Sequence, residues 1–417
     1  MSDTAGTGAV LVVGGGISGL TAALEAAEVG SDVFIVDKNP YFGGRVAQLN
    51  QYFPKLCPPT CGLEINFRRV KDNRKVRTYS MTTVKSISGN AGNYEVVLET
   101  APRFVNSNCT ACGDCADACT TEIDNAFNFG MDKTKAIYLP HEMAFPRRFV
   151  LDKDACSAED LEAIKGACKY DAVDLDMQTE TFTVNVGSIV WATGWNPYDA
   201  DKIDNLKVNQ SPAIITNMMM ERMAAPNGPT GGKILRPGDD KEPESIAFVQ
   251  CAGSRDENHL EFCSYICCMA TFKQMTYIRE RYPEAKIYVF YIDLRTPGKY
   301  EHFREKLMGD ENAQFIKGKV ADILAEDDGG VTVVAENAVT GAKIQQKVDM
   351  CVLATGMQPA LGDQGKALGV NMDGNGFVVS DAEKGQVAAG CAKSASDVYT
   401  SAQSSTAAAL KAIQIGR

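Results

Sequence analysis

Cysteine offers this sequence more chemistry than any other residue type. The 417 residues include 14 cysteines but only 3 histidines. Thiolates bind soft metals and iron–sulfur clusters, and thiol pairs exchange electrons by forming disulfides. In a reducing cytosol so many thiols favour cofactor ligands or redox groups over structural disulfides. The spacing of the cysteines decides among these roles.

Four cysteines within residues 109–119 form the pattern C-x2-C-x2-C-x3-C, which is typical of bacterial-type ferredoxins. Thiolates two residues apart in a tight loop can converge on one four-iron, four-sulfur (4Fe-4S) cluster. In two-cluster ferredoxins the last cysteine of such a run ligates the other cluster, so the fourth ligand comes from elsewhere. A later segment, Cys168-Lys-Tyr-Asp-Ala-Val-Asp174, resembles the closing half of a second motif. The predicted ligands are Cys109, Cys112, Cys115 and Cys168, with Cys119 as the alternative fourth ligand.

Cys119 and Cys156 then remain as relics of a lost second ferredoxin site. No proline follows Cys119, which departs from the ferredoxin pattern and keeps its assignment open.

A second group of four cysteines lies in a predicted strand–helix–strand unit. Residues 245–250 and 286–293 are expected to form strands, and residues 263–281 a helix. A pyridine-nucleotide-using flavoenzyme would carry a second glycine fingerprint here, but only Gly253 remains. Cys263 and Cys267 are expected on one helical face, with Cys268 adjacent and Cys251 at the strand end. The group predicts a second cluster, with a structural zinc or packing thiols as alternatives.

Cys57 and Cys61 form a separate pair with three open interpretations: a flavin dithiol, ligands shared with a neighbouring subunit, or structural thiols. Pro58 and Pro59 oppose a helix at this pair. Cys351, in an apolar strand, is expected in the core.

The start of the chain predicts a βαβ unit. An apolar strand at residues 9–13 runs into Gly14-Gly-Gly-Ile-Ser-Gly19, a helix follows to about residue 29, and a strand at residues 32–36 ends on Asp37. This is the dinucleotide-binding fingerprint, in which the glycines allow a tight turn, a close pyrophosphate and close packing. Asp37 can accept from ribose hydroxyls.

Further segments resemble flavoproteins with two dinucleotide-binding domains, which implies FAD. They are Gly43-Gly44-Arg45, Ala192-Thr193-Gly194, Ala354-Thr355-Gly356 and Gly390-Cys391. These flavoproteins usually carry an acid after the last glycine, where this sequence has Cys391. The expected FAD-binding residues are Gly14, Gly16, Ile17, Ser18, Gly19, Asp37, Lys38, Gly44, Arg45, Ala192, Thr193, Gly194, Thr355, Gly356, Gly390 and Cys391.

The predicted fold is α/β: a Rossmann-like FAD domain, a second Rossmann-like domain, and a ferredoxin-like iron–sulfur insertion. Strands at residues 94–98 and 181–186 should pair as a hairpin, although about 80 residues of different composition separate them. The expected parts are an FAD domain (1–100, continued at 181–244 and 346–417), the insertion (101–180) and the second domain (245–345).

Composition excludes several functions. The net charge of −11 disfavours a broad electrostatic grip on nucleic acid or anionic lipid. No apolar run reaches the length of a membrane helix, and the first residues lack the basic flank of a signal peptide, so we expect a cytoplasmic protein. No nucleophile–base pair stands out, so we predict no hydrolytic catalytic residue.

The run Val249-Gln-Cys-Ala-Gly-Ser-Arg-Asp256, with Cys263-Ser-Tyr-Ile-Cys-Cys-Met269 and Tyr288-Val-Phe-Tyr-Ile-Asp-Leu-Arg295, resembles the flavoprotein component of heterodisulfide reductases, their A subunit. The compact length and degenerate second ferredoxin half are more similar to the A subunit of the quinone-interacting membrane-bound oxidoreductase complex of sulfate reducers.

This resemblance implies an FAD and iron–sulfur electron-transfer subunit, peripheral on the inner face of the cell membrane through its partners. The partners would be a haem-containing membrane subunit with a second flavin/iron–sulfur subunit, and electrons would pass between menaquinone and adenylylsulfate reductase. Arg45, Arg255 and Lys273 are candidates for tuning potentials. Alternatives are a pyridine-nucleotide-dependent flavin disulfide reductase, a zinc-bearing scaffold and an electron-bifurcating flavin subunit.

Overall fold

The computed structural model describes residues 8–416, which divide into two compact units. Unit 1 runs up to Trp195 and includes Pro359–Ser394 and the residues from Val398 onward, whereas unit 2 comprises Asn196–Gln358 and Ala395–Asp397. The chain leaves unit 1 in β12 (Trp195–Pro197) and returns in β21 (Met357–Pro359), and these two strands pair. None of the helices within residues 8–416 combines the length and the apolar character needed to cross a bilayer.

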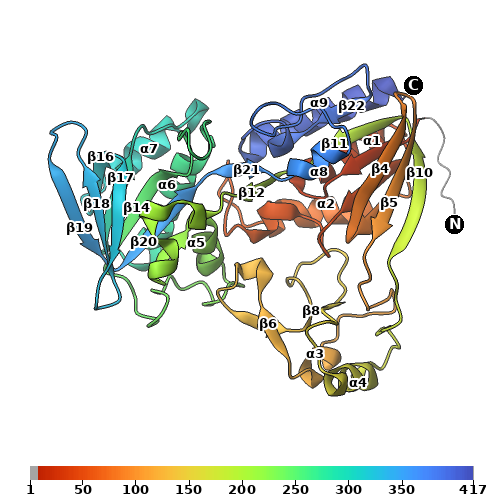
Figure 1. The fold of residues 1–417 in the computed structure, drawn as a ribbon, viewed down its shortest axis with the longest axis horizontal. Coiled ribbons are helices and arrows are strands. Elements are labelled where there is room, and N and C mark those ends of the chain that lie inside the picture. The colour runs from red at the N-terminus through yellow and green to blue at the C-terminus, as the bar shows by residue number, and fades with distance from the viewer. Residues whose placement is uncertain (1–7, 417) are drawn as a thin grey trace. The chain divides into compact units, whose positions relative to one another are not determined.

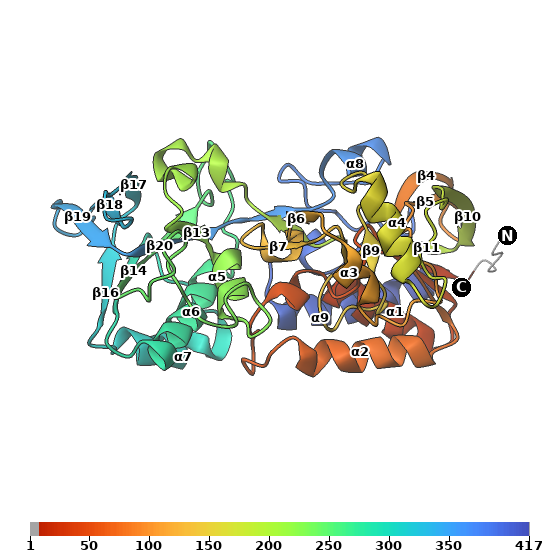
Figure 2. The ribbon, with the colours of Figure 1, turned by 90° about the horizontal axis from the view of Figure 1, so that it is seen from below.

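Unit 1 is built on a five-stranded parallel sheet with the order β22-β11-β1-β2-β3. Figure 1 labels two of its strands, β11 and β22. Its strands are β1 (Val10–Val13), β2 (Val33–Asp37), β3 (Val76–Ser80), β11 (Ser188–Trp191) and β22 (Gln386–Ala388). One face packs against three helices, which lie together in Figure 2: α1 (Ile17–Glu28), α2 (Thr60–Asp72) and α9 (Val398–Ile415). Because both faces of the sheet are covered, its central strands are continuous apolar runs.

The other face of this sheet packs against a three-stranded antiparallel sheet. Its strands are β4 (Thr82–Asn90), β5 (Asn93–Thr100) and β10 (Glu180–Val186). β10 pairs with β5 from Glu180 opposite Thr100 to Val186 opposite Tyr94, so the predicted pairing of these distant segments is confirmed. Residues 101–179 therefore leave and re-enter this antiparallel sheet at neighbouring strand ends. The short α8 (Gly362–Ala367) completes this part.

The inserted segment has its own small core. Its elements are α3 (Asp114–Ala118), β6 (Glu122–Asp124), β7 (Lys133–Lys135), β8 (Ile137–Tyr138), β9 (Val150–Leu151) and α4 (Ala158–Ala167). Val105, Ile137 and Ile164 are buried in this core together with Cys115 and Cys119. A backbone hydrogen bond joins the segment to the sheet domain, in which Phe42 N–H donates to the Phe145 carbonyl at 2.8 Å.

Unit 2 contains a second five-stranded parallel sheet, ordered β13-β20-β14-β15-β16. The strands are β13 (Ile214–Thr216), β14 (Ser245–Ala252), β15 (Lys286–Tyr291), β16 (Ala313–Lys317) and β20 (Met350–Thr355). An antiparallel sheet of β17 (Val320–Ala325), β18 (Val331–Glu336) and β19 (Lys343–Val348) follows, and the helices are α5 (Asn217–Ala224), α6 (Cys267–Arg281) and α7 (Glu301–Met308). Short 3₁₀ helices lie at Gly44–Gln48, Ala126–Asn128, Ala200–Lys202, Asp204–Leu206, Val208–Gln210, Gly298–Tyr300 and Gly390–Ala392.

The units differ from the predicted division at two places. Residues 196–244 and 346–358, which the sequence assigned to the FAD domain, group with unit 2. The physical reason is sheet pairing, because β20 lies between β13 and β14 and makes parallel ladders with both.

The start of α6 also differs from the prediction. The helix begins at Cys267, so the expectation that Cys263 and Cys267 share one helical face is wrong. Tyr265 has a φ of 66°, and this left-handed backbone cannot continue a right-handed helix. Cys263 therefore lies in the loop before α6.

Candidate cofactor sites

The glycine loop after β1 requires residues without a side chain. A Cβ atom on Gly14, whose φ is 108°, would lie 2.3 Å from the Ala192 carbonyl oxygen. A Cβ atom on Gly19 would lie 1.7 Å from the Gly14 carbonyl oxygen, so this glycine allows α1 to pack on the loop. Gly16 is the N-cap of α1. The first N–H groups of a helix lack intrahelical acceptors and favour an anion, so this end can receive a pyrophosphate.

Asp37 closes β2 beside this loop. Its Oδ2 atom accepts from Gly15 N–H at 2.7 Å, and its Oδ1 atom accepts from Asn39 N–H at 2.8 Å. Burial raises the pKa of Asp37, while hydrogen bonds from Asn39 and Gly15 act in the opposite direction. The carboxylate thus fixes the loop and lies where a dinucleotide-binding βαβ unit presents its acid to a ribose.

Two observations show that the chain around this loop fits a dinucleotide. The Thr193 hydroxyl is buried and lacks a hydrogen-bond partner within the protein. Buried hydroxyls are normally satisfied, so this orphaned group suits a polar ligand. Gly43 N–H donates to the Gly15 carbonyl at 2.8 Å, and a Cβ atom on Gly44 would approach Gly16 Cα to 2.9 Å. The two predicted glycine segments therefore meet.

The C-terminal glycine predicted to bind cofactor also joins this region. Gly390 has a φ of 57°, and a Cβ atom there would lie 1.9 Å from Ser18 Oγ. Its neighbour Cys391 is buried, and its sulfur lies 3.7 Å from Ser401 Oγ of α9. The structure therefore packs the Cys391 thiol against α9.

Other predicted residues lie in different surroundings. Arg45 is held inside unit 1, since its Nε donates to the Trp195 carbonyl at 3.2 Å and its Nη1 to Gln48 Oε1 at 2.9 Å. Lys38 is exposed. Thr355 and Gly356 lie in unit 2, where a Cβ atom on Gly356 would meet Ser254 Oγ at 2.3 Å.

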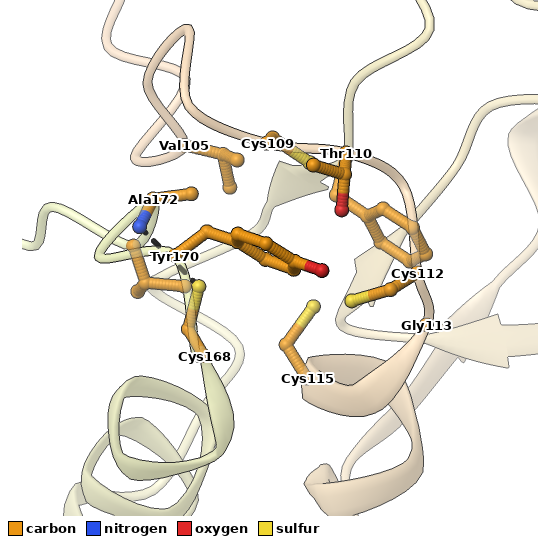
Figure 3. A pocket seen from close by; sticks show the side chains of 11 residues that line it. Val105, Cys109, Thr110, Cys112, Gly113, Cys115, Cys168, Tyr170 and Ala172 are labelled. Carbon is orange, nitrogen blue, oxygen red and sulfur yellow. Dashed lines mark hydrogen bonds between the residues drawn. The ribbon is translucent and has the colours of Figure 1, made fainter.

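The inserted segment brings four cysteines to one pocket. Cys109, Cys112, Cys115 and Cys168 line it together with Tyr170 (Figure 3). Cys168 follows the last turn of α4, whereas the other three come from the loop and first turn of α3. The predicted set with Cys168 as the fourth member is thus the one that the fold gathers.

Backbone amides point at the sulfurs of this group. Ala111 N–H donates to Cys109 Sγ at 3.4 Å, and Ala172 N–H donates to Cys168 Sγ at 3.3 Å. Such bonds stabilise the negative charge of ligand thiolates. Burial, followed by the nearby Cys109, raises the pKa of Cys115 to about 12, so this thiol holds its proton until a metal displaces it.

Cys119 lies elsewhere in the insertion. Its thiol is buried and donates to the Thr121 carbonyl at 3.5 Å, and the Cys156 thiol lies nearby. Asp160 of α4 accepts from Thr121 N–H at 3.0 Å and fixes this arrangement. The two cysteines interpreted as relics are therefore neighbours.

The second cysteine group surrounds a loop of unusual backbone. Cys251, Arg255 and Tyr265 all have φ between 56° and 66°, a region that L-residues seldom adopt. Such conformations cost free energy and are concentrated at functional sites. The loop brings Cys251, Cys263, Cys267 and Cys268 near enough to perturb one another electrostatically.

Each sulfur of this group has polar neighbours. The Arg255 guanidinium lies close to Cys251 and 2.8 Å from Asp293 Oδ2, and Tyr265 N–H donates to Cys263 Sγ at 3.4 Å. The Cys267 thiol donates to the Thr355 carbonyl at 3.8 Å and the Cys268 thiol to the Asp293 carbonyl at 3.6 Å. Burial, followed by Cys268, raises the pKa of Cys251 to about 11, and burial raises that of Cys267 well above its usual value.

The donor set of these groups indicates which cofactor they could hold. Within residues 8–416, no group of three or more histidine, cysteine, aspartate or glutamate side chains is arranged to hold a single metal ion. The amide-to-sulfur hydrogen bonds and the four-thiol composition fit an iron–sulfur cluster.

Sequence reasoning missed Asp293 and Tyr170. A signal was present for Asp293, because it follows β15, which pairs with β14, the strand that contains Cys251 near its end. Lys273, predicted to tune a potential, instead forms a buried ion pair with Glu221 at 3.2 Å.

Comparison with known proteins places the chain among flavoproteins. Residues 9–58 match the family of FAD dependent oxidoreductases. Over 97% of its length the chain is 35% identical to the A subunit of the ferredoxin/F(420)H(2)-dependent CoB-CoM heterodisulfide reductase of Methanosarcina acetivorans, of which it covers 53%. It is 33% identical, again over 97% of its length, to the A subunit of the H(2):CoB-CoM heterodisulfide,ferredoxin reductase of Methanothermobacter marburgensis, of which it covers 63%. The chain thus spans between half and two thirds of these relatives.

Solved structures show the same fold at low sequence identity. Thioredoxin reductase from T. acidophilum superimposes with a TM-score of 0.55 at 14% identity, with 97% of both chains covered. Thioredoxin reductase from Lactococcus lactis gives a TM-score of 0.55 at 13% identity, with 98% of both chains covered. The predicted two-domain α/β flavoprotein fold is confirmed.

Proposed function

We propose that the chain, which is similar to the A subunit of heterodisulfide reductases, carries electrons between a two-electron and a one-electron partner within a multi-subunit complex. The observation that carries the proposal is the pocket where four cysteines of the inserted segment converge. Four thiolates in one pocket suit an iron–sulfur cluster, which transfers single electrons.

FAD would bind in unit 1. The glycine loop, the N-terminus of α1, Asp37 and the Thr193 hydroxyl would hold it. One 4Fe-4S cluster would be held by Cys109, Cys112, Cys115 and Cys168, and a second by Cys251, Cys263, Cys267 and Cys268. When bound, FAD exchanges one or two electrons and each cluster exchanges one.

The protein's own residues set how readily these groups take up charge. The Arg255 guanidinium beside Cys251 places a positive charge where a reduced cluster gains negative charge. The amides of Ala111, Ala172 and Tyr265 act in the same direction. Burial of Cys267 excludes water from one side of the second group.

The physiological partners follow from the resemblance to the quinone-interacting complex of sulfate reducers. We infer that the chain works beside a haem-containing membrane subunit with a second flavin/iron–sulfur subunit, and passes electrons between menaquinone and adenylylsulfate reductase. It would then be cytoplasmic and peripheral on the inner face of the membrane. The loss of a second ferredoxin site supports this assignment, because Cys119 and Cys156 lie near each other and outside the four-cysteine pocket.

A second candidate is electron bifurcation. It is favoured by the name of one relative, part of a heterodisulfide,ferredoxin reductase. Bifurcation requires strongly crossed flavin potentials, which a redox titration would show.

One experiment separates these functions from a pyridine-nucleotide-dependent reductase. The anaerobic chain is mixed first with NADH or NADPH and then, in the reconstituted complex, with a menaquinol. We expect flavin bleaching only in the second case. Bleaching of the isolated chain by a pyridine nucleotide would overturn the proposal.

A further inference from the structure

A second kind of redox chemistry is available in unit 1, at Cys57 and Cys61. The two residues lie between the 3₁₀ helix Gly44–Gln48 and α2. Cys57 is held by a β-bridge to Tyr52, whose N–H donates to the Cys57 carbonyl at 3.0 Å. Cys61 is the second residue of α2, whose N-cap is Pro59. The expectation that the prolines oppose a helix here is wrong, because proline is tolerated at a helix start.

The two cysteines lie at one turn of the chain. Cys61 N–H donates to the Pro58 carbonyl at 3.0 Å, which closes the turn between them. The nearby Cys61 side chain is the leading cause that raises the pKa of Cys57. A disulfide forms between cysteines that the backbone already holds close together, and this turn does so.

Exposure to solvent distinguishes Cys57 and Cys61 from the other thiols. Cys61 is exposed and Cys57 partly exposed. The neighbouring cysteines Cys119 and Cys156 differ in this respect, because Cys119 is only 2% exposed. Neither Cys57 nor Cys61 lines the pocket of the insertion. A soluble disulfide can therefore reach the pair at the start of α2.

We propose that Cys57 and Cys61 form a two-electron dithiol–disulfide couple that exchanges with low-molecular-weight disulfides. The Cys61 sulfur, after losing its proton, attacks one sulfur of a compound R–S–S–R. The other R–S group leaves as a thiolate, and a mixed disulfide remains on Cys61. The Cys57 sulfur then loses its proton and attacks Cys61. A second thiolate leaves, the two protons convert both thiolates to thiols, and two electrons have passed from the pair to the compound.

The sequence provides a direct readout of this step. Trypsin cleaves after Lys55 and Arg68, so both cysteines fall in one peptide, residues 56–68. Cys119 and Cys156 fall in separate peptides, and a disulfide between them would appear as a cross-link. The reduced, anaerobic chain with its cofactors is exposed briefly to glutathione disulfide, alkylated and digested with trypsin. The masses of the peptides are then measured by mass spectrometry.

The expected product is the 56–68 peptide without alkylation and lighter by two hydrogen atoms, with two glutathiones released per chain. Cys57→Ser should trap glutathione on Cys61, and Cys61→Ser should slow glutathione release by at least about tenfold. Cys156→Ser, the matched control, should behave as the unmodified chain.

Two results would overturn the proposal. One is full alkylation of both cysteines after exposure to the disulfide. The other is a fall in iron content in Cys57→Ser or Cys61→Ser, which would make the pair cluster ligands.

Discussion

Replacing Cys168 by serine tests which cysteine completes the ferredoxin-like group, and Cys119→Ser is its matched control. Cys168 lines the pocket with the three cysteines of the α3 loop and accepts an amide hydrogen bond at 3.3 Å. Cys119 instead faces Thr121 and Cys156. Both variants replace a thiol by a hydroxyl, one at the predicted fourth ligand, Cys168, and the other at the alternative fourth ligand, Cys119.

The expected loss of iron follows from the number of four-cysteine groups. Two groups of four cysteines correspond to about eight irons per chain. Cys168→Ser should remove one cluster, which lowers iron and sulfide to about four each. Cys119→Ser should keep about eight, because it changes only a thiol outside the pocket. FAD should be retained in both variants, since Asp37 and the glycine loop lie in the sheet domain.

The assay is iron, acid-labile sulfide and flavin per chain after anaerobic purification. Circular dichroism of both variants checks that unit 1 has folded. The reasoning would be refuted if Cys119→Ser lost half its iron while Cys168→Ser kept all of it.

Three further predictions concern the pH dependence of cluster loading, the core of unit 2 and the flavin site. Cluster assembly in the apo chain should weaken as the pH is lowered from about 9 to about 6. The reason is that Cys115, whose pKa is raised to about 12, must release its proton to become a ligand. Cluster loading that is independent of pH would contradict this. Glu221→Gln should lower the free energy of unfolding by about 3–5 kcal/mol in urea titrations, because it leaves the buried Lys273 without its anion. The exposed pair of Arg69 and Glu28 gives the comparison, and Glu28→Gln should cost less than about 1 kcal/mol; equal losses would dismiss the burial argument. Asp37→Ala should weaken FAD retention at least about tenfold in dialysis measurements, because the loop loses the carboxylate that binds Gly15 N–H; unchanged retention would remove Asp37 from the site.

The first βαβ unit could be predicted closely from sequence. Its glycines, apolar strands and acid are local features. β1 and β2 begin and end within one residue of the expected positions, whereas α1 begins at Ile17, before the expected start after Gly19. The pairing of β5 with β10 was also predictable, because both strands alternate and the segment between them differs in composition.

Other features depend on contacts that local patterns do not show. The left-handed conformation of Tyr265 moves the start of α6, and sheet pairing moves β20 into unit 2. The choice between Cys119 and Cys168 rests on the path of α4, which returns Cys168 to the pocket. Spacing alone left that choice open.

The central claim is that both four-cysteine groups hold iron and sulfide in a chain that also binds one FAD. The most direct test is elemental and cofactor analysis of the unmodified chain, purified without oxygen. The account predicts about eight irons, about eight sulfides and one FAD per chain. Stoichiometric zinc without acid-labile sulfide would contradict it.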